Sequence, residues 1–322
     1  MEITITGTNA LTYPYVHVWD WRIAIYLFLG GLTAGLLVMS AIANLRKEKQ
    51  EAKDKACCIK GPMWAPFILM LGMVFIWFDV DRKFNSFWFF LSFQPLSPMS
   101  WGAWGVGLII PVSFLYGLSV VPPELNELLR FDILKRLAAY LNPYMRKLAM
   151  INFGLGIFLG VYTGVLLSAL VARPLWNSSI LPLLFLNSAL STGAALIIII
   201  ARRTSVKLYF TKLDIWLIIA EIVIILLFFY GHYTSTGPQR NSIMPFFSFT
   251  SEYFLYGASI ILITILFPLA LVMKLLEVQE DHGDELPPAA VFKMKLSAYM
   301  VLAGGFIIRL AFVYAGQLSK LT

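Results

Sequence analysis

The chain has 322 residues, of which 59% are hydrophobic, 15% aromatic and only 13% charged. This composition excludes an ordinary soluble domain, in which about a quarter of the residues are charged, and indicates an integral membrane protein. The formal net charge of +7 does not indicate nucleic-acid binding, because no basic domain stands apart from the apolar segments.

Eight apolar stretches follow one another along the chain. Each is long enough to cross the hydrocarbon core of a bilayer as a helix, which takes about 20 residues. The predicted spans cover residues 22–45, 62–80, 101–121, 148–171, 178–201, 213–231, 254–274 and 296–316. The connection 122–147 predicts a short amphipathic helix that lies at the membrane surface.

The basic residues predict how these spans are oriented. Eighteen of the 25 Lys and Arg residues lie in, or at the edges of, the segments after the first, third, fifth and seventh spans. The positive-inside rule makes these segments cytoplasmic, so both termini are expected on the outer side. Residues 1–21 lack the basic start and cleavage site of a secretory signal, so the first span is expected to serve as its own insertion signal.

A faint internal repeat appears along the chain. Trp19 precedes Phe28 by nine residues, Trp176 precedes Phe185 by the same nine, and a run of small residues follows each pair. Because four spans separate the copies, the two halves would share one orientation and be related by an axis along the membrane normal. Chance similarity between two apolar helices is the alternative.

The repeat predicts an all-α fold of eight transmembrane helices in two side-by-side four-helix bundles. Their boundaries would be residues 1–175 and 176–322. Gly31 and Gly35 form a pair of small residues one turn apart in the first span, which would let another helix approach closely. A general abundance of Gly in membrane helices is the alternative reading of that pair.

Ionisable groups within the spans are few, and each is costly in a bilayer unless it is paired or hydrated. Glu221 lies near the middle of the sixth span and Arg309 in the outer half of the eighth. Asp79 ends the second span, Asp81 follows just beyond it, and Tyr162 lies in the outer half of the fourth. All but Glu221 share one depth, so we expect a polar site toward the outer face.

The entrance to the first span adds polar and aromatic residues at the same depth. His17, Asp20 and Arg22 flank Trp19 and Trp21. Membrane interfaces collect Trp and basic residues as anchors, and for both Trp residues and Arg22 this reading is favoured. His17 remains a candidate for proton exchange near neutral pH.

The segment 84–104, between the second and third spans, is dense in aromatic residues and carries little charge. A segment of this composition should lie flat against the membrane surface. It would either wall a site for an apolar, ring-shaped molecule or dock a partner protein. An ordinary interfacial aromatic belt is the alternative.

Metal and haem sites are tested by counting possible ligands. The chain has only three histidines, so a bis-histidine haem would have to use His17 and His232, since His282 lies in a charged cytoplasmic segment. The two cysteines, Cys57 and Cys58, are adjacent and form no CxxC pattern. The sequence therefore predicts neither an iron–sulfur cluster nor a structural metal site in this chain.

Several segments resemble the NrfD/PsrC family, the integral membrane, quinone-interacting subunits of polysulfide reductase-type respiratory complexes. They are WDWRIAIYLFLGGLTAG (19–35), Asp79 followed by Arg82, SPMSWGAW (97–104) and the run from Tyr162 to Gly193. One departure stands out: the family commonly has Asp-Leu-Gly-Arg-Pro at the end of the second span, and this protein has Asp79-Val80-Asp81-Arg82-Lys83.

The resemblance implies two four-helix bundles without haem, in the inner membrane, with both termini in the periplasm. It implies a pocket for menaquinone or another quinone near the outer face. It also implies a ferredoxin-like iron–sulfur subunit on the periplasmic face, which serves a molybdopterin or multihaem catalytic subunit. The protein would be the quinol dehydrogenase or quinone reductase subunit and would complete no reaction alone. Beyond these subunits, membrane lipid is the expected partner.

The residues expected to carry this chemistry are quinone-binding His17, Trp21, Tyr162 and Arg309, with Asp79, Asp81 and Glu221 for proton transfer. Arg309 would hold Asp79 ionised or polarise a quinone oxygen, and Glu221 would begin a proton path across the bilayer. Two other functions remain open. A secondary transporter would bind its substrate near the midplane, and a cytochrome b-type anchor would hold haem.

Overall fold

The computed structural model describes residues 19–45, 52–80, 83–121, 131–201, 203–249, 251–272 and 287–319. Every regular element within these ranges is helical. His17 and Asp81, both predicted for the site, lie outside the described residues, as does His282.

Eight helical segments in the described ranges are long and apolar enough to cross a membrane, which confirms the eight predicted spans. They are α1 (Trp21–Leu45), α2 (Ala52–Asp79), α4 (Pro98–Val120), α6 (Met145–Ser168), α7 (Leu181–Ile200), α8 (Thr204–Tyr233), α10 (Glu252–Ser259) continued by the π-helix η4 (Ile260–Leu266), and α12 (Pro288–Leu318). The shorter elements are η1 (Lys83–Asn85), α3 (Trp88–Leu91), α5 (Asp132–Leu141), η3 (Asn142–Tyr144) and α9 (Gly237–Phe247).

Three helices begin well before the residue that hydropathy predicted. α2 begins at Ala52 against residue 62, α8 at Thr204 against residue 213, and α12 at Pro288 against residue 296. All three extensions contain lysines, which lower the local hydropathy without interrupting a helix. Long basic side chains can reach the membrane surface from within the last turns of a span.

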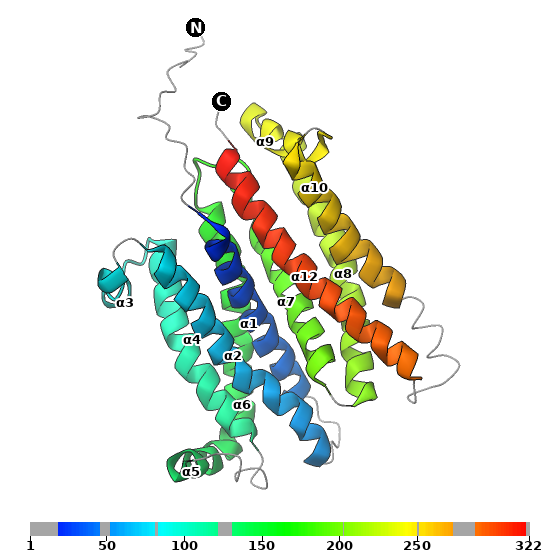
Figure 1. The fold of residues 1–322 in the computed structure, drawn as a ribbon. Coiled ribbons are helices and arrows are strands. Elements are labelled where there is room, and N and C mark those ends of the chain that lie inside the picture. The colour runs from blue at the N-terminus through cyan, green and yellow to red at the C-terminus, as the bar shows by residue number, and fades with distance from the viewer. Residues whose placement is uncertain are drawn as a thin grey trace.

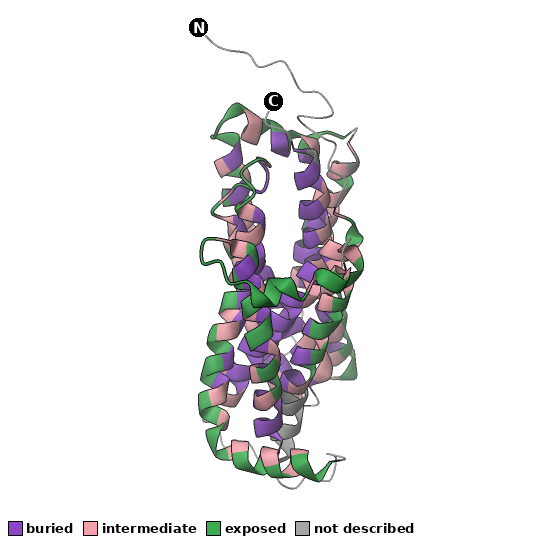
Figure 2. Cartoon of the chain, turned by 90° about the vertical axis from the view of Figure 1, so that its left-hand side faces the viewer, coloured by how far each residue is buried: buried purple, intermediate pink, exposed green. Residues whose placement is uncertain are grey.

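α1 occupies the centre of the arrangement. It packs against α2, α6, α7 and α12, and Figure 1 shows α2, α4 and α6 on one side of it and α8, α10 and α12 on the other. α7 also packs against α6, α8 and α12. Figure 2 shows buried positions in the interior and exposed positions on the outside. Many of the exposed residues are large and apolar, as expected for helices that face lipid.

Small residues allow α1 and α7 to cross in backbone contact. A Cβ atom on Gly35 would overlap the carbonyl oxygen of Ala189, and one on Gly193 would overlap the backbone of Gly35. The prediction of a close helix approach is confirmed at Gly35, whereas Gly31 faces the Arg309 side chain of α12. Where α1 begins, the rings of Trp19 and Trp176 stack with centroids 5.1 Å apart.

The first and last spans meet at one end of the molecule. The backbone N–H of Trp19 donates to Oε1 of Gln317 at 3.0 Å, and Nε2 of Gln317 donates to the carbonyl oxygen of Trp19 at 2.8 Å. α1 therefore begins at the end where α12 finishes. This end also carries α3 and is called the α3 end below; the opposite one, with α5, is the α5 end (Figure 1).

The predicted amphipathic helix is present as α5. Leu134, Leu137 and Leu141 pack against the core, while Lys135 and Asp132 form an exposed ion pair at 3.3 Å. Apolar residues spaced three and four apart place one apolar face toward the bundle. The helix therefore covers the α5 ends of its neighbours.

Candidate functional site

The main candidate site is a cavity of about 580 Å³ among α1, α2, α4 and α6, bordered by α3. Its lining is mostly apolar, with a few polar groups. The residues are Trp19, Ile23, Tyr26, Leu27, Met73, Val74, Ile76, Trp77, Asp79, Val80, Ser86, Phe89, Phe90, Met99, Gly102, Ala103, Val106, Ile110, Tyr162, Leu166 and Leu167. This volume and lining are typical of sites for small organic molecules.

α2 and α4 differ in their contacts at the two ends of the molecule. Toward the α5 end, a Cβ on Gly117 of α4 would lie 3.1 Å from Cα of Met63 in α2. Toward the α3 end, both helices line the cavity, α2 with Met73 and α4 with Val106. Side chains of both helices, rather than backbone contact, therefore border the space at the α3 end.

Two phenols enter the cavity from its buried side. Tyr162 of α6 stacks on Phe158, with ring centroids 6.0 Å apart, and is only 5% exposed. Tyr26 of α1 is 6% exposed and interacts electrostatically with Tyr162. Neither phenol donates a hydrogen bond to a described residue. Two buried donors therefore border an apolar space, an arrangement that favours a ligand with acceptor atoms.

Gly102 of α4 makes room for the Tyr162 ring. A Cβ at this position would overlap the hydroxyl oxygen and Cζ of Tyr162 and would lie 2.6 Å from its Cε1. Gly102 belongs to the SPMSWGAW motif, so that motif contributes space as well as side chains. The ring position depends on the absence of a side chain here.

The remaining predicted residues near the α3 end differ in position. Asp79, the last residue of α2, lines the cavity, as does Trp19. Trp21 is 49% exposed, meets Phe75 edge to face at 6.1 Å and lies outside the lining. The structure thus brings Asp79 and Tyr162 to one cavity and leaves Trp21 on the outer surface of α1.

Arg309 is fully buried and lies behind the cavity wall. Its Nε donates to the carbonyl oxygen of Leu27 at 3.0 Å, and Nη1 donates to the carbonyl of Gly305 at 2.7 Å and to Oγ of Ser188 at 3.2 Å. Nη2 has no hydrogen-bond partner among the described residues and lies over Gly31. Since Leu27 lines the cavity and Arg309 does not, Arg309 holds the wall from outside it.

Glu221 lies away from the cavity, on the buried face of α8. It is 1% exposed, and neither carboxylate oxygen forms a hydrogen bond of ordinary geometry in the described part of the protein, although the Ser188 hydroxyl lies near enough to act on its charge. Its charge is influenced by Asp214 and Arg309. Asp214, 4% exposed, accepts a hydrogen bond from Oγ of Ser191 at 2.6 Å.

Lys207, Asp214 and Glu221 follow one another at seven-residue intervals on α8, and all three are buried. Two helical turns take about seven residues, so these side chains share one face and together extend over about 20 Å. Sequence reasoning identified only Glu221. Hydropathy placed the start of the sixth span at residue 213, which left Lys207 outside the span and Asp214 at its very edge. The seven-residue spacing of charges in an apolar sequence was the available signal.

His232 was a possible haem ligand. It is buried at the end of α8, with Nδ1 2.9 Å from the carbonyl oxygen of Phe228 and Nε2 3.3 Å from that of Pro174. Both ring nitrogens thus lie within hydrogen-bonding distance of backbone carbonyls. This gives His232 a structural role at the end of the helix.

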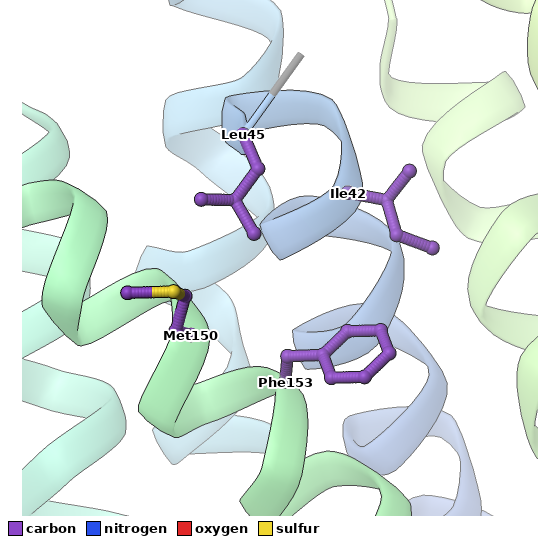
Figure 3. Close-up of a pocket in the computed structure, with 4 residues that line it drawn as sticks. All are labelled: Ile42, Leu45, Met150 and Phe153. Atoms are coloured by element: carbon purple, nitrogen blue, oxygen red, sulfur yellow. The ribbon is translucent and has the colours of Figure 1, made fainter.

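A second hollow, of about 370 Å³, lies between α1 and α6 nearer the α5 end. Figure 3 shows its lining, Ile42 and Leu45 from α1 and Met150 and Phe153 from α6. All four side chains are apolar. None can donate a hydrogen bond to a carbonyl, so the first cavity is the better site for a polar reacting group.

Comparison with known proteins identifies the class to which the protein belongs. The family model described as "Polysulphide reductase, NrfD" matches residues 9–319. With its eight apolar helices, the chain is a multi-pass membrane protein. It belongs to the polysulphide reductase NrfD family, as the sequence resemblance predicted.

Three relatives illustrate the match. The protein is 32% identical to the C subunit of polysulfide reductase from Wolinella succinogenes, over 93% of its own length and 94% of the relative. It is 30% identical to protein NrfD of Escherichia coli, over 70% of its own length and 75% of that relative. It is 28% identical to the protein NrfD homolog of Haemophilus influenzae, over 94% of its own length and 95% of that relative.

Proposed function

We propose that this protein is the quinone-reactive membrane subunit of a respiratory oxidoreductase, and that menaquinone or another quinone binds in the cavity between α2 and α4. The observation that carries the proposal is the pair of phenols, Tyr26 and Tyr162, which border the cavity without donating to a described residue. A quinone ring is apolar on its faces and has two carbonyl acceptors, which matches such a lining.

A bound quinone or quinol supplies two-electron, two-proton redox chemistry. The protein's own residues position it and handle its protons. Tyr162 donates a hydrogen bond to one ring oxygen from the buried side, and Tyr26 provides a second phenol near it. Asp79 passes protons toward the surface at the α3 end. His17, two residues before Trp19 in the sequence, is proposed as the group that exchanges protons with the other oxygen.

Electrons must leave or arrive through another subunit, since the sequence offers no ligand set for a cluster. We propose a ferredoxin-like iron–sulfur partner on the periplasmic face, connected to a molybdopterin or multihaem catalytic subunit. The name of the Wolinella succinogenes relative, which designates one of several polypeptides of a polysulfide reductase, supports a multisubunit reductase. Purification in mild detergent, followed by identification of the co-purifying subunits, tests this directly.

The arrangement proposed for this role is two four-helix bundles, residues 1–175 and 176–322, in the inner membrane with both termini periplasmic. The hydrogen bonds between Trp19 and Gln317 support termini on one side. The basic connections support the outward direction of that side. Labelling of a cysteine introduced near either terminus, with a reagent that cannot cross the membrane, tests it.

The quinone site is tested with phenol substitutions. We expect Tyr162→Phe to abolish quinone-coupled turnover of the assembled complex, because a buried ring oxygen then loses its donor. Tyr116→Phe is the matched control: Tyr116 is fully buried in α4, and its hydroxyl accepts a hydrogen bond from Asn44 far from the cavity. His17→Ala should resemble Tyr162→Phe. Normal quinol oxidation in both site variants would refute the site.

We also infer that the charged face of α8 moves protons across the membrane. A carboxylate buried without a hydrogen bond of ordinary geometry to a described residue, as Glu221 is, is costly in hydrocarbon unless it serves a function or contacts water. Asp214 and Lys207 continue the same face toward the α5 end. Together the three residues cover most of the thickness of the hydrocarbon core, which is about 30 Å.

Proton movement in liposomes that contain the complex tests the second role. Glu221→Gln keeps the shape of the side chain and removes its charge, so proton uptake or release across the membrane should be lost while quinol oxidation continues. The control is Asp132→Asn, which neutralises an exposed acid that forms a surface ion pair on α5 and should leave proton movement intact. Unchanged proton movement in Glu221→Gln would assign the residue to structure alone.

A further inference from the structure

We infer that the hollow between α1 and α6 near the α5 end binds an acyl chain of an anionic phospholipid, and that Arg146 and Lys147 hold the phosphate of the same molecule. This site is separate from the cavity proposed for quinone, and the inference goes beyond the proposed function without depending on it. The juxtaposition that carries it is an open apolar hollow with two exposed cations one helical turn nearer the α5 end, on the same face of α6.

The hollow lies where α1 ends and α6 begins (Figure 3). Leu45 is the last residue of α1 and Ile42 precedes it by about one turn; both are partly buried and pack against the core. Met150 and Phe153, in the first three turns of α6, are 55% and 39% exposed. The hollow is therefore closed toward the protein and open toward the outside, where a membrane span faces lipid.

The lining of the hollow favours a hydrocarbon chain over a helix of a partner. Its volume is about 370 Å³, and the four lining side chains offer no strong hydrogen-bonding group. Membrane helices approach each other closely through small residues, and the described lining contains no Gly, Ala or Ser. A flexible acyl chain can instead follow an irregular groove between large side chains and make dispersion contacts along its length.

Two exposed cations, Arg146 and Lys147, precede Met150 on α6 by four and three residues. Residues at these spacings on a helix have Cβ atoms about 5–6 Å apart, so both cations are neighbours of Met150. Helical side chains lean toward the N-terminus of their helix, which for α6 is the α5 end. The two charged groups are thereby placed beyond the hollow, in the direction of the membrane surface.

Neither cation is neutralised within the described part of the protein. No described carboxylate forms an ion pair with Arg146 or Lys147, and Nζ of Lys147 lies 5.8 Å from the ring centroid of Tyr144. The sequences of α1 and α6 contain no Asp or Glu. A phosphate at this position would meet two positive charges and no negative charge on the helices that form the hollow.

A phospholipid presents the same order of groups along the membrane normal, with a phosphate at the surface and acyl chains beneath it. Phe153 follows Arg146 by seven residues, which is about 10 Å along the helix axis. The face therefore extends from the level of a headgroup into the hydrocarbon. Basic pockets between membrane helices are typical sites for anionic headgroups. A zwitterionic headgroup adds an ammonium group that the two cations would repel, so the arrangement selects an anionic lipid.

The charge selection is tested by native mass spectrometry of the full-length protein in detergent, titrated with phosphatidylglycerol or with phosphatidylcholine of the same acyl chains. Phosphatidylglycerol should bind more tightly. The double variant Arg146→Gln and Lys147→Gln should weaken its binding about thirtyfold, which corresponds to about 2 kcal/mol for two cations. The matched control, Lys135→Gln and Arg136→Gln, removes one Lys and one Arg from α5 at the same end of the molecule and should bind normally.

The chain site is tested with Met150→Trp, which fills the hollow from α6 and leaves both cations in place. Phosphatidylglycerol binding should weaken about tenfold, the effect of displacing about two methylene groups of the chain. Ile151→Trp is the control, because Ile151 is 50% exposed on the same helix and does not line the hollow. It should bind normally.

Four results would overturn the site. They are equal binding of the two lipids, equal loss in the two charge variants, unchanged binding in Met150→Trp, and the added mass of a polypeptide in place of lipid. Equal loss would mean a general attraction of anionic lipid to basic residues at this end. None of these measurements involves a quinone, so their outcome is independent of the proposed function.

Discussion

Gly102→Ala tests how closely the cavity depends on the position of one phenol. The new Cβ would overlap the hydroxyl oxygen of Tyr162 and lie 2.6 Å from Cε1 of the same ring. Since unstrained carbon contacts lie near 3.5 Å, the ring must withdraw by about 1 Å. Phe158, whose ring stacks on that of Tyr162 at a centroid distance of 6.0 Å, limits how far the ring can move toward it.

The expected loss follows from that displacement. A withdrawal of about 1 Å takes a hydroxyl out of hydrogen-bonding range of a ligand that is held by other contacts, and one such bond contributes about 0.5–1.5 kcal/mol. Quinone affinity should therefore fall roughly two- to tenfold. Turnover should fall further, by up to about a hundredfold, because a misplacement of 1 Å at a reacting group has that effect.

Affinity is measured by the quenching of tryptophan fluorescence on titration with quinone, since Trp19 and Trp77 line the cavity. Gly154→Ala is the control: it adds the same methyl group to α6, the helix of Tyr162, where a Cβ would meet nothing within 4 Å. Gly154→Ala should bind and turn over normally. Equal behaviour of the two variants would contradict a role for the Tyr162 position in ligand binding.

Three further experiments test the helix contacts. Gly193→Val should separate α1 from α7, where even a Cβ overlaps the backbone of Gly35, and should destabilise the detergent-solubilised protein by about 1–3 kcal/mol or more in thermal unfolding. Trp176→Phe removes a 2.7 Å hydrogen bond to the carbonyl of Phe312, which should cost about 1 kcal/mol; an unchanged midpoint would count against that bond. Arg309→Gln and Glu221→Gln form a double-mutant cycle. Their effects on the free energy of unfolding should differ from additivity by about 0.5–3 kcal/mol, because each charge acts on the other. Strictly additive effects would exclude the interaction.

Hydropathy was sufficient to predict the eight spans, because each must satisfy its backbone hydrogen bonds within the helix and present apolar side chains to lipid. Hydropathy placed the starts of α8 and α12 too late in the sequence. Lysines in the first turns lower the mean hydropathy of that stretch, yet the helix continues through them. The periodicity of buried charges would have corrected the first of these boundaries, since Lys207 and Asp214 share the face of Glu221.

The matching residues of the internal repeat lie close together in the structure. Its two tryptophans, Trp19 and Trp176, stack on each other, and Phe28 and Phe185 both lie near the Arg309 guanidinium, at 5.9 and 5.6 Å from its Cζ. Equivalent residues of two repeats meet only near the axis that relates them. These contacts are the ones that such an axis between α1 and α7 would produce, although the division into two bundles stays a prediction.

The candidate site was predicted only in part, because a cavity is a property of helix packing. Tyr162 and Asp79 were found from their depth along the spans. Tyr26 and Gly102 were not, since a tyrosine or a glycine in an apolar helix carries no signal that distinguishes a cavity wall from ordinary packing. The close approach of α2 to α4 at Gly117, at the other end of the pair, carried no such signal either.

The cavity and the charged face of α8 meet at one residue. Arg309 holds the carbonyl of Leu27, in the cavity wall, and its guanidinium acts on the charge of Glu221. Any change in the charge of Glu221 therefore alters the force on the side chain that positions this wall. The hydroxyl of Ser188 accepts a hydrogen bond from Nη1 of Arg309 and also acts on the charge of Glu221, so it links the two charged groups. If quinone chemistry and proton movement are coupled in this protein, Arg309 is the contact through which that coupling must be sought.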